Sequence, residues 1–164
     1  MCKILKLYSI PEKYINVFKA LNRNLSYCIR TREGLTNVFD TVSGVKQDCI
    51  LAPFLFLMVI DFVIRKTMEN KYFGIIWDHR RPADVDFADD LALLDHTHEA
   101  LQDMTNRLHG LGKKVGLRIS NRKTKTMTVG KQHFMPPITV DNQNIKNVHK
   151  FQYLGNYMAK DGDV

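Results

Sequence analysis

Hydrophobic positions in two parts of the 164-residue chain recur every three or four residues, the spacing of a helix with one apolar face. The first predicted helix covers about residues 11–25, and the second lies between Thr97 and Gly116. Thr97 is a candidate N-cap, and Gly116 stands just beyond the last apolar position. A denser apolar run predicts a third helix from Pro53 to about Glu69, because proline is compatible with the first turn of a helix.

Short runs of β-branched and aromatic residues between these helices predict strands. They lie at about 27–31, 38–42, 75–77, 125–129 and 138–140, and segment 148–158 is rich in strand formers. Residues 84–95 predict a hairpin, and Asp141-Asn142 predicts a turn. Strand runs with helices on one face indicate an α+β fold built on a sheet. We expect a single domain, since a chain of this length can bury a real core.

The predicted hairpin carries the sequence Phe87-Ala88-Asp89-Asp90 at its centre. A tight turn aims two adjacent carboxylates at one point, and oxygen ligands of this kind suit Mg²⁺. A pair of Mg²⁺ ions can organise in-line attack on a phosphate. Taken alone, the acidic pair is more typical of a solvated turn than of a metal site, because Asp side chains bond their own backbone there.

Three further segments accompany the acidic pair in a defined order. Gly44 to Phe56 is a glycine-led polar loop that runs into the apolar helix, and Gly116 to Lys125 and Phe151 to Gly155 follow downstream. In order and spacing, the four segments resemble the reverse transcriptases of non-LTR (LINE-type) retrotransposons. The resemblance runs from about Lys3 to the C-terminus.

This resemblance implies a fragment of an RNA-directed DNA polymerase from a retrotransposon. It implies Mg²⁺ as the cofactor, with Mn²⁺ as the alternative ion, and an RNA template, a DNA primer and dNTPs as partners. Within one partial domain, residues 1–83 would belong to the fingers and palm, and residues 84–164 to the palm with its two hairpins. In the family, the primer 3′-hydroxyl attacks the α-phosphate of the nucleotide.

Roles for single residues also follow from the resemblance. Asp89 would be the main metal ligand and Asp90 its neighbour in the metal environment, while Phe87 would support the hairpin tip from within. The nucleotide and template-primer side would comprise Gly44, Gln47, Phe87 and Lys123, and the primer grip would comprise Leu154 and Gly155. A plain surface lysine remains the alternative for Lys123, and a plain strand and turn for Leu154 and Gly155.

The chain also departs from the family pattern. The family's metal site uses a further aspartate on a palm strand that we expect N-terminal to Met1, and we expect the thumb beyond Val164. Ala52 stands where the family usually has serine, and Asp48 stands where it has glycine, adding a negative charge toward phosphate. We therefore expect this chain alone to be inactive. A noncatalytic nucleic-acid-binding remnant of a retroelement stays open as the alternative.

The net charge of +7 favours an acidic partner, for which nucleic acid is the best fit. Basic residues cluster at Arg80-Arg81, Lys113-Lys114 and 118–125, although the first two clusters are equally consistent with a solvated surface. Three widely spaced cysteines predict neither zinc nor disulfides. An unrelated Mg²⁺-dependent phosphohydrolase would need further ligands near the tip; the candidates are Asp84, Asp86 and Asp95, with His96 and His98 as weaker ones.

The longest apolar run, Ile50 to Ile60, is shorter than the ~20 residues needed to span a bilayer. Lys3 and Lys6 interrupt the N-terminus, so no signal peptide is predicted. We expect an intracellular protein without a membrane partner, with the cytoplasm and the nucleus both open.

Overall fold

The computed structural model describes residues 1–23, 26–40, 49–130 and 135–161. The chain divides into two compact units, Met1–Phe62 and Val63–Val164, and each is described by itself. Within the described ranges, no helix is long and apolar enough to cross a membrane.

The first unit is built on α1 (Cys2–Leu7), α2 (Glu12–Leu21) and the beginning of α3 (Ala52–Met68). Leu5, Ile15 and Leu55 form its buried core. Phe18 packs against this core as the spacing predicts, but Leu21 at the end of α2 is 51% exposed. The predicted α2 is confirmed and ends earlier than expected, whereas α1 was not predicted.

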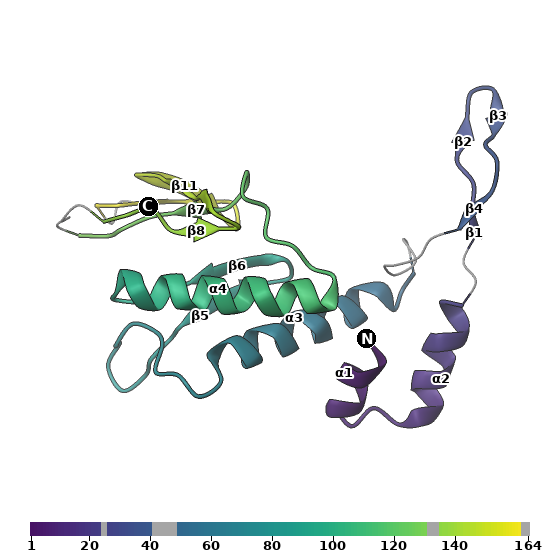
Figure 1. Ribbon diagram of the computed structural model, residues 1–164, viewed down its shortest axis with the longest axis horizontal. Coiled ribbons are helices and arrows are strands. Elements are labelled where there is room, and N and C mark those ends of the chain that lie inside the picture. The colour runs from purple at the N-terminus through teal and green to yellow at the C-terminus, as the bar shows by residue number, and fades with distance from the viewer. Residues whose placement is uncertain (24–25, 41–48, 131–134, 162–164) are drawn as a thin grey trace. The chain divides into compact units, whose positions relative to one another are not determined.

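Residues 26–40 of the same unit form one long hairpin (Figure 1). Its outer pair joins β1 (Ser26–Tyr27) to β4 (Phe39–Asp40), and its inner pair joins β2 (Arg30–Thr31) to β3 (Gly34–Leu35). The rings of Tyr27 and Phe39 stack across the outer pair. The two predicted strands of this region are confirmed as shorter segments, and residues 41–42 of the second lie outside the described residues.

The second unit contains the end of α3 and the whole of α4 (His98–Val115). The Thr97 hydroxyl accepts a hydrogen bond from the Ala100 amide at 3.2 Å, and Gly116 ends α4 in the left-handed conformation with φ 87°. Both predicted ends of the helix are therefore confirmed. Arg107 on α4 donates to the carbonyl oxygens of Lys66 and Glu69, so α4 satisfies acceptors at the end of α3.

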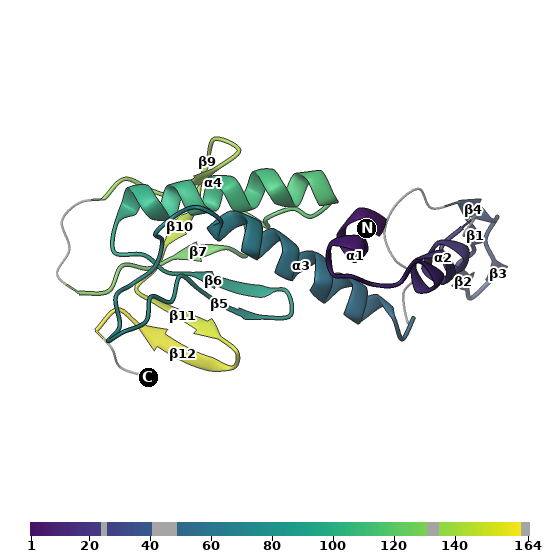
Figure 2. The same ribbon diagram turned by 90° about the horizontal axis from the view of Figure 1, so that it is seen from below.

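In its described residues, the second unit also contains eight short strands. They are β5 (Asp84–Phe87), β6 (Asp90–Leu93), β7 (Lys125–Thr126), β8 (Thr139–Val140), β9 (Gln143–Asn144), β10 (Lys146–Asn147), β11 (Lys150–Tyr153) and β12 (Asn156–Ala159). Three antiparallel hairpins, β5–β6, β8–β9 and β11–β12, stand beside the parallel pair β7–β10. Helix α4 contacts β6 and β8 (Figures 1 and 2). Ile138, Val140 and Ile145 form a buried cluster, against which Leu101 of α4 and Ile119 pack.

The structure supports the α+β class, but the described strands do not join into the expected incomplete palm sheet. In the part of the chain that is described, the strands form six separate two-stranded pairs. Each strand is only two to four residues long, and most pair with a neighbour in sequence through a short turn. The predicted strand at 75–77 is also wrong, because Trp77 pairs only with Arg80 in an isolated bridge within a loop.

Candidate active site

The acidic pair lies at the tip of the β5–β6 hairpin. Phe87 pairs with Asp90, which leaves Ala88 and Asp89 as a two-residue loop. Loops of this length need a positive φ at their first residue, and Ala88 supplies it at φ 55° without being glycine. This conformation is strained for a residue with a Cβ, and such strain occurs most often at functional sites.

The pairing register decides which side chains share a face of this hairpin. Residues opposite each other in an antiparallel pair project to the same side, so Val85, Phe87 and Asp90 share one face and Asp84 and Asp86 the other. Asp89 and Asp90 are both exposed, and Asp89 is in the turn as predicted. Phe87 is 65% exposed, so the expectation that it supports the tip from within is wrong: its face of the hairpin is open.

Asp84 at the base of β5 has a different environment from the acids at the tip. Partial burial raises the pKa of its carboxyl, and the charge of Asp86 on the same face raises it further. The hairpin therefore carries one carboxyl that resists ionisation and an acidic pair that is open to solvent.

Tyr153, the last residue of β11, connects the segment Phe151 to Gly155 to this hairpin. Its hydroxyl donates to the carbonyl oxygen of Val85 at 3.1 Å and lies 3.5 Å from that of Asp90. Figure 2 shows the β5–β6 and β11–β12 hairpins side by side. Burial raises the pKa of the Tyr153 hydroxyl, and the charges of Asp90 and Asp86 raise it further, so it remains a hydrogen-bond donor at neutral pH.

Leu154 and Gly155, the predicted primer-grip residues, form the two-residue turn between β11 and β12. Both have positive φ, 49° and 87°, which is the combination of a type I′ turn. Leu154 is 49% exposed at this tip. The strand and turn that were kept open as the plain alternative are therefore present, and a primer-grip role remains a prediction.

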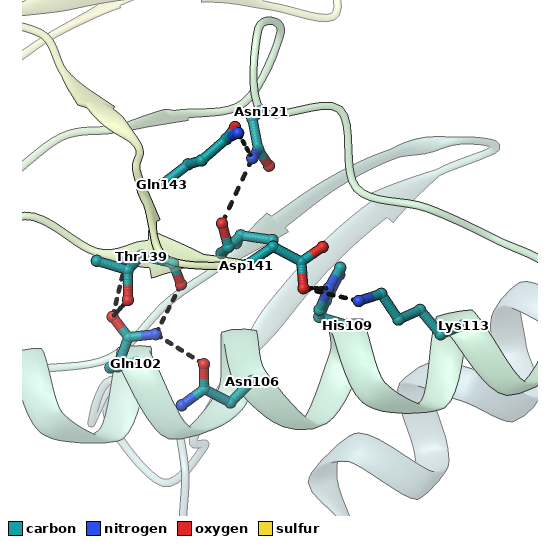
Figure 3. Close-up of polar contacts among 9 residues, drawn as sticks. Gln102, Asn106, His109, Lys113, Asn121, Thr139, Asp141 and Gln143 are labelled. Carbon is teal, nitrogen blue, oxygen red and sulfur yellow. Dashed lines mark hydrogen bonds and ion pairs between the residues drawn. The ribbon is translucent and has the colours of Figure 1, made fainter.

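Lys123 lies in an exposed turn that begins at Ser120, whose carbonyl oxygen accepts from the Lys123 amide at 3.0 Å. Asn121 fixes this turn to the β8–β9 hairpin, because its amide donates to the Gln143 side chain at 2.7 Å and lies 3.4 Å from the Val140 carbonyl oxygen (Figure 3). Arg122 is exposed beside it. These contacts hold the basic turn around Lys123 against the β8–β9 hairpin.

Polar contacts with α4 in turn hold the β8–β9 hairpin in place (Figure 3). The Gln102 amide bonds the backbone of Thr139 twice, accepting from its N–H at 2.8 Å and donating to its C=O at 2.9 Å. Asp141 lies 2.7 Å from Lys113 and 3.0 Å from His109. The hydrogen bond from Lys113, followed by that from His109, lowers the pKa of Asp141. Sequence patterns gave no signal for these partners, which lie about thirty or more residues apart.

The remaining predicted residues are distributed as follows. Gly44, Gln47 and Asp48 lie outside the described residues. Asp95 accepts from the Gly74 and Thr97 amides, and His96 Nε2 accepts from the Ile76 amide, so both have structural partners in place of a metal. Although burial alone raises the pKa of Asp95, these amide hydrogen bonds together lower it. Among the described residues, no group of three or more His, Cys, Asp or Glu side chains could hold a metal ion.

Comparison with known proteins decides the family. The profile of the family described as reverse transcriptase (RNA-dependent DNA polymerase) matches residues 2–158. The chain belongs to this family. It is also 34% identical, over 123 residues, to the retrovirus-related Pol polyprotein from type-1 retrotransposable element R2 of Nasonia vitripennis.

The match to this polyprotein covers 68% of the chain but only 12% of the polyprotein. The resemblance to non-LTR retrotransposon reverse transcriptases is therefore confirmed, and the chain is a reverse transcriptase segment of that kind. Neither match favours the noncatalytic remnant.

Proposed function

We propose that this segment belongs to an RNA-directed DNA polymerase and that the β5–β6 hairpin carries its nucleotidyl-transfer site. The observation that carries the proposal is the exposed pair Asp89 and Asp90 at a strained tip, to which Tyr153 ties the β11–β12 hairpin. We assign residues 1–83 to the fingers and palm and residues 84–164 to the palm.

The donor set at the tip fits a hard divalent cation. Asp89 and Asp90 offer exposed carboxylate oxygens, which Mg²⁺ accepts together with substrate phosphate, and Mn²⁺ is the alternative ion. Such a cation supplies charge stabilisation for the oxygens that attack and leave at a phosphate. In this assignment Asp89 is the main ligand and Asp90 its neighbour.

An RNA template, a DNA primer and dNTPs are the proposed substrates. The net charge of +7 and the exposed basic turn around Lys123 favour polyanions of this kind. In this proposal Leu154 and Gly155 contact the primer end. Gly44 and Gln47, on sequence grounds alone, belong to the nucleotide side with Phe87.

Primer extension on an RNA template tests the proposal with four polypeptides. The first is the 164-residue chain, and the second carries an upstream palm strand that supplies a further aspartate. The third adds Asp48→Gly to the second, and the fourth adds Asp89→Asn to the third. Asp86→Asn, which removes a charge from the other face of the same hairpin, is the matched control.

We expect no extension by the first polypeptide, because two carboxylates leave most of the ligand shell of the ion to other groups. Extension should require the added aspartate and Asp48→Gly, disappear with Asp89→Asn, and survive Asp86→Asn. Extension that survives Asp89→Asn, or robust extension by the unaltered chain, would contradict the proposal.

A further inference from the structure

The loop between α3 and β5 presents the chain's single tryptophan on its surface. In residues 74–82, called here the Trp77 loop, the Trp77 and Arg80 backbones exchange hydrogen bonds of 3.0 and 2.9 Å, and the Ile75 amide donates to the Pro82 carbonyl oxygen at 2.9 Å. Trp77 is nevertheless 70% exposed. A large apolar ring is therefore displayed on a closed backbone hairpin.

Two contacts fix this loop to the segment that follows β6. The Gly74 amide donates to the Asp95 carboxylate at 2.8 Å, and the Ile76 amide donates to His96 Nε2 at 2.8 Å. Gly74 has φ 106°, and a Cβ there would lie 2.5 Å from the Pro82 carbonyl oxygen, so only glycine fits. The loop is consequently ordered before any ligand arrives.

The charge around Trp77 defines the chemistry of a ligand. Trp77, Arg80, Arg81 and Pro82 line one shallow surface concavity. Both arginines are exposed, and Nε of Arg81 donates to the Gly74 carbonyl oxygen at 3.2 Å, which holds that side chain against the loop. An indole with guanidinium groups beside it matches a flat base joined to phosphates.

We propose that the Trp77 loop binds an unpaired nucleotide of a single-stranded nucleic acid, with the indole stacked on the base and the arginines on the flanking phosphates. This inference rests on the proposed polymerase function, since it names a further contact for that polymerase's nucleic acid. The loop stands at the base of β5, and the four residues of that strand, about 13 Å at roughly 3.3 Å each, separate it from the acidic tip. A single-stranded nucleic acid that passes the acidic tip therefore reaches the Trp77 loop within a few nucleotides.

Fluorescence of the single tryptophan tests the inference without any polymerisation. All indole emission of this chain comes from Trp77, so stacking of a base should quench it on titration with a single-stranded oligonucleotide. Inorganic polyphosphate, which has charge but no bases, is the control ligand and should not quench. Quenching by polyphosphate to the same extent would overturn stacking.

Anisotropy of a labelled oligonucleotide then measures total binding with each variant. Trp77→Ala should weaken binding about tenfold, whereas Trp77→Phe, which keeps an aromatic face, should retain most of it. Tyr72→Ala is the matched control, because Tyr72 is a 91% exposed aromatic residue that does not line the concavity. Arg80→Ala should weaken binding more than Lys13→Ala, an equal charge change at an exposed position on α2.

The two readouts separate failure of this inference from failure of the proposed function. If anisotropy detects binding that Trp77→Ala leaves unchanged, and the oligonucleotide does not quench Trp77, the Trp77 site is overturned. The polymerase assignment would then still stand. If neither anisotropy nor fluorescence detects binding, the Trp77 site and the proposed polymerase function are both overturned. Quenching together with weaker binding by Trp77→Ala supports the inference.

Discussion

Single residues in this chain hold together parts that lie far apart in sequence. Tyr153 and Val85 are 68 positions apart, and one hydroxyl joins them. Asn121, Gln102 and Asp141 make comparable links between α4, the basic turn and the β8–β9 hairpin. At this scale, stability and the placement of the proposed site depend on the same hydrogen bonds.

Tyr153→Phe should lower the free energy of unfolding by about 0.5–1 kcal/mol, because it removes one partly exposed hydrogen bond and keeps the ring. The midpoint of urea unfolding measures this. Because the pKa of Tyr153 is raised in the folded protein, the protonated hydroxyl stabilises the fold below the unfolded pKa of ~10. This stabilisation is lost as the pH rises through the higher pKa of the folded state. Tyr157→Phe is the control, and an equal effect there would contradict the prediction.

Asp141→Asn should change the response of the protein to acid. In the folded protein, Lys113 and then His109 lower the pKa of Asp141. The ionised carboxylate therefore stabilises the fold above the ordinary pKa of about 3.9, and this stabilisation is lost as the pH falls through the lower pKa of the folded state. Thermal unfolding followed between pH 5 and pH 2 (about the range of this titration) should show a shallower acid dependence in the variant. An unchanged dependence would remove Asp141 as a source of acid sensitivity.

At the scale of elements, local sequence signals predicted local structure well. The helical spacing located α2 and α4, a dense apolar run with Pro53 located α3, and the N-cap and the glycine located both ends of α4. The acidic hairpin and the Asp141-Asn142 turn were also predicted, because each depends on adjacent residues. Residues 75–77 of the Trp77 loop were wrongly predicted as a strand. Their backbone belongs to a loop whose Gly74 and Ile76 amides bond to Asp95 and His96, partners that the local sequence does not indicate.

Contacts between elements were beyond what the sequence could predict. The pairing of β7 with β10, the separation of the strands into six pairs and the docking of Tyr153 all depend on distant partners that no local pattern specifies. The family resemblance implies a primer-grip role for the β11–β12 hairpin, which stays a prediction, but it did not indicate the hydrogen bond to the acidic hairpin.

Gln102→Ala tests how α4 holds the β8–β9 hairpin. The change leaves the N–H and C=O of Thr139 without their partner in a partly buried position, so we expect a loss of about 1–3 kcal/mol in the free energy of unfolding. Asn106→Ala, which leaves both Thr139 bonds in place, should cost less than about 0.5 kcal/mol. Equal losses in chemical denaturation would show that the paired amide contact is not the cause.

At the scale of the whole molecule, the positive charge should govern its affinity for nucleic acid. Each phosphate neutralised on a single strand contributes about 0.7 to the slope of log affinity against log salt. Replacing Arg118, Arg122 and Lys123 by alanine should therefore lower that slope by about 2. The charge-matched control replaces three exposed lysines elsewhere, Lys3, Lys13 and Lys114. A slope near zero for the unaltered chain would refute the electrostatic account.

In the proposed function, Asp89 and Asp90 at the β5–β6 tip hold the catalytic cation next to Tyr153. Titration of the ¹⁵N-labelled chain with Mn²⁺, followed by amide NMR, locates the bound ion, because a paramagnetic ion broadens signals near its binding site. We expect the Asp89, Asp90 and Tyr153 signals to disappear first. The joint variant Asp89→Asn and Asp90→Asn should remove this effect, and Asp86→Asn should not. Broadening centred elsewhere, or unchanged in the joint variant, would contradict this assignment.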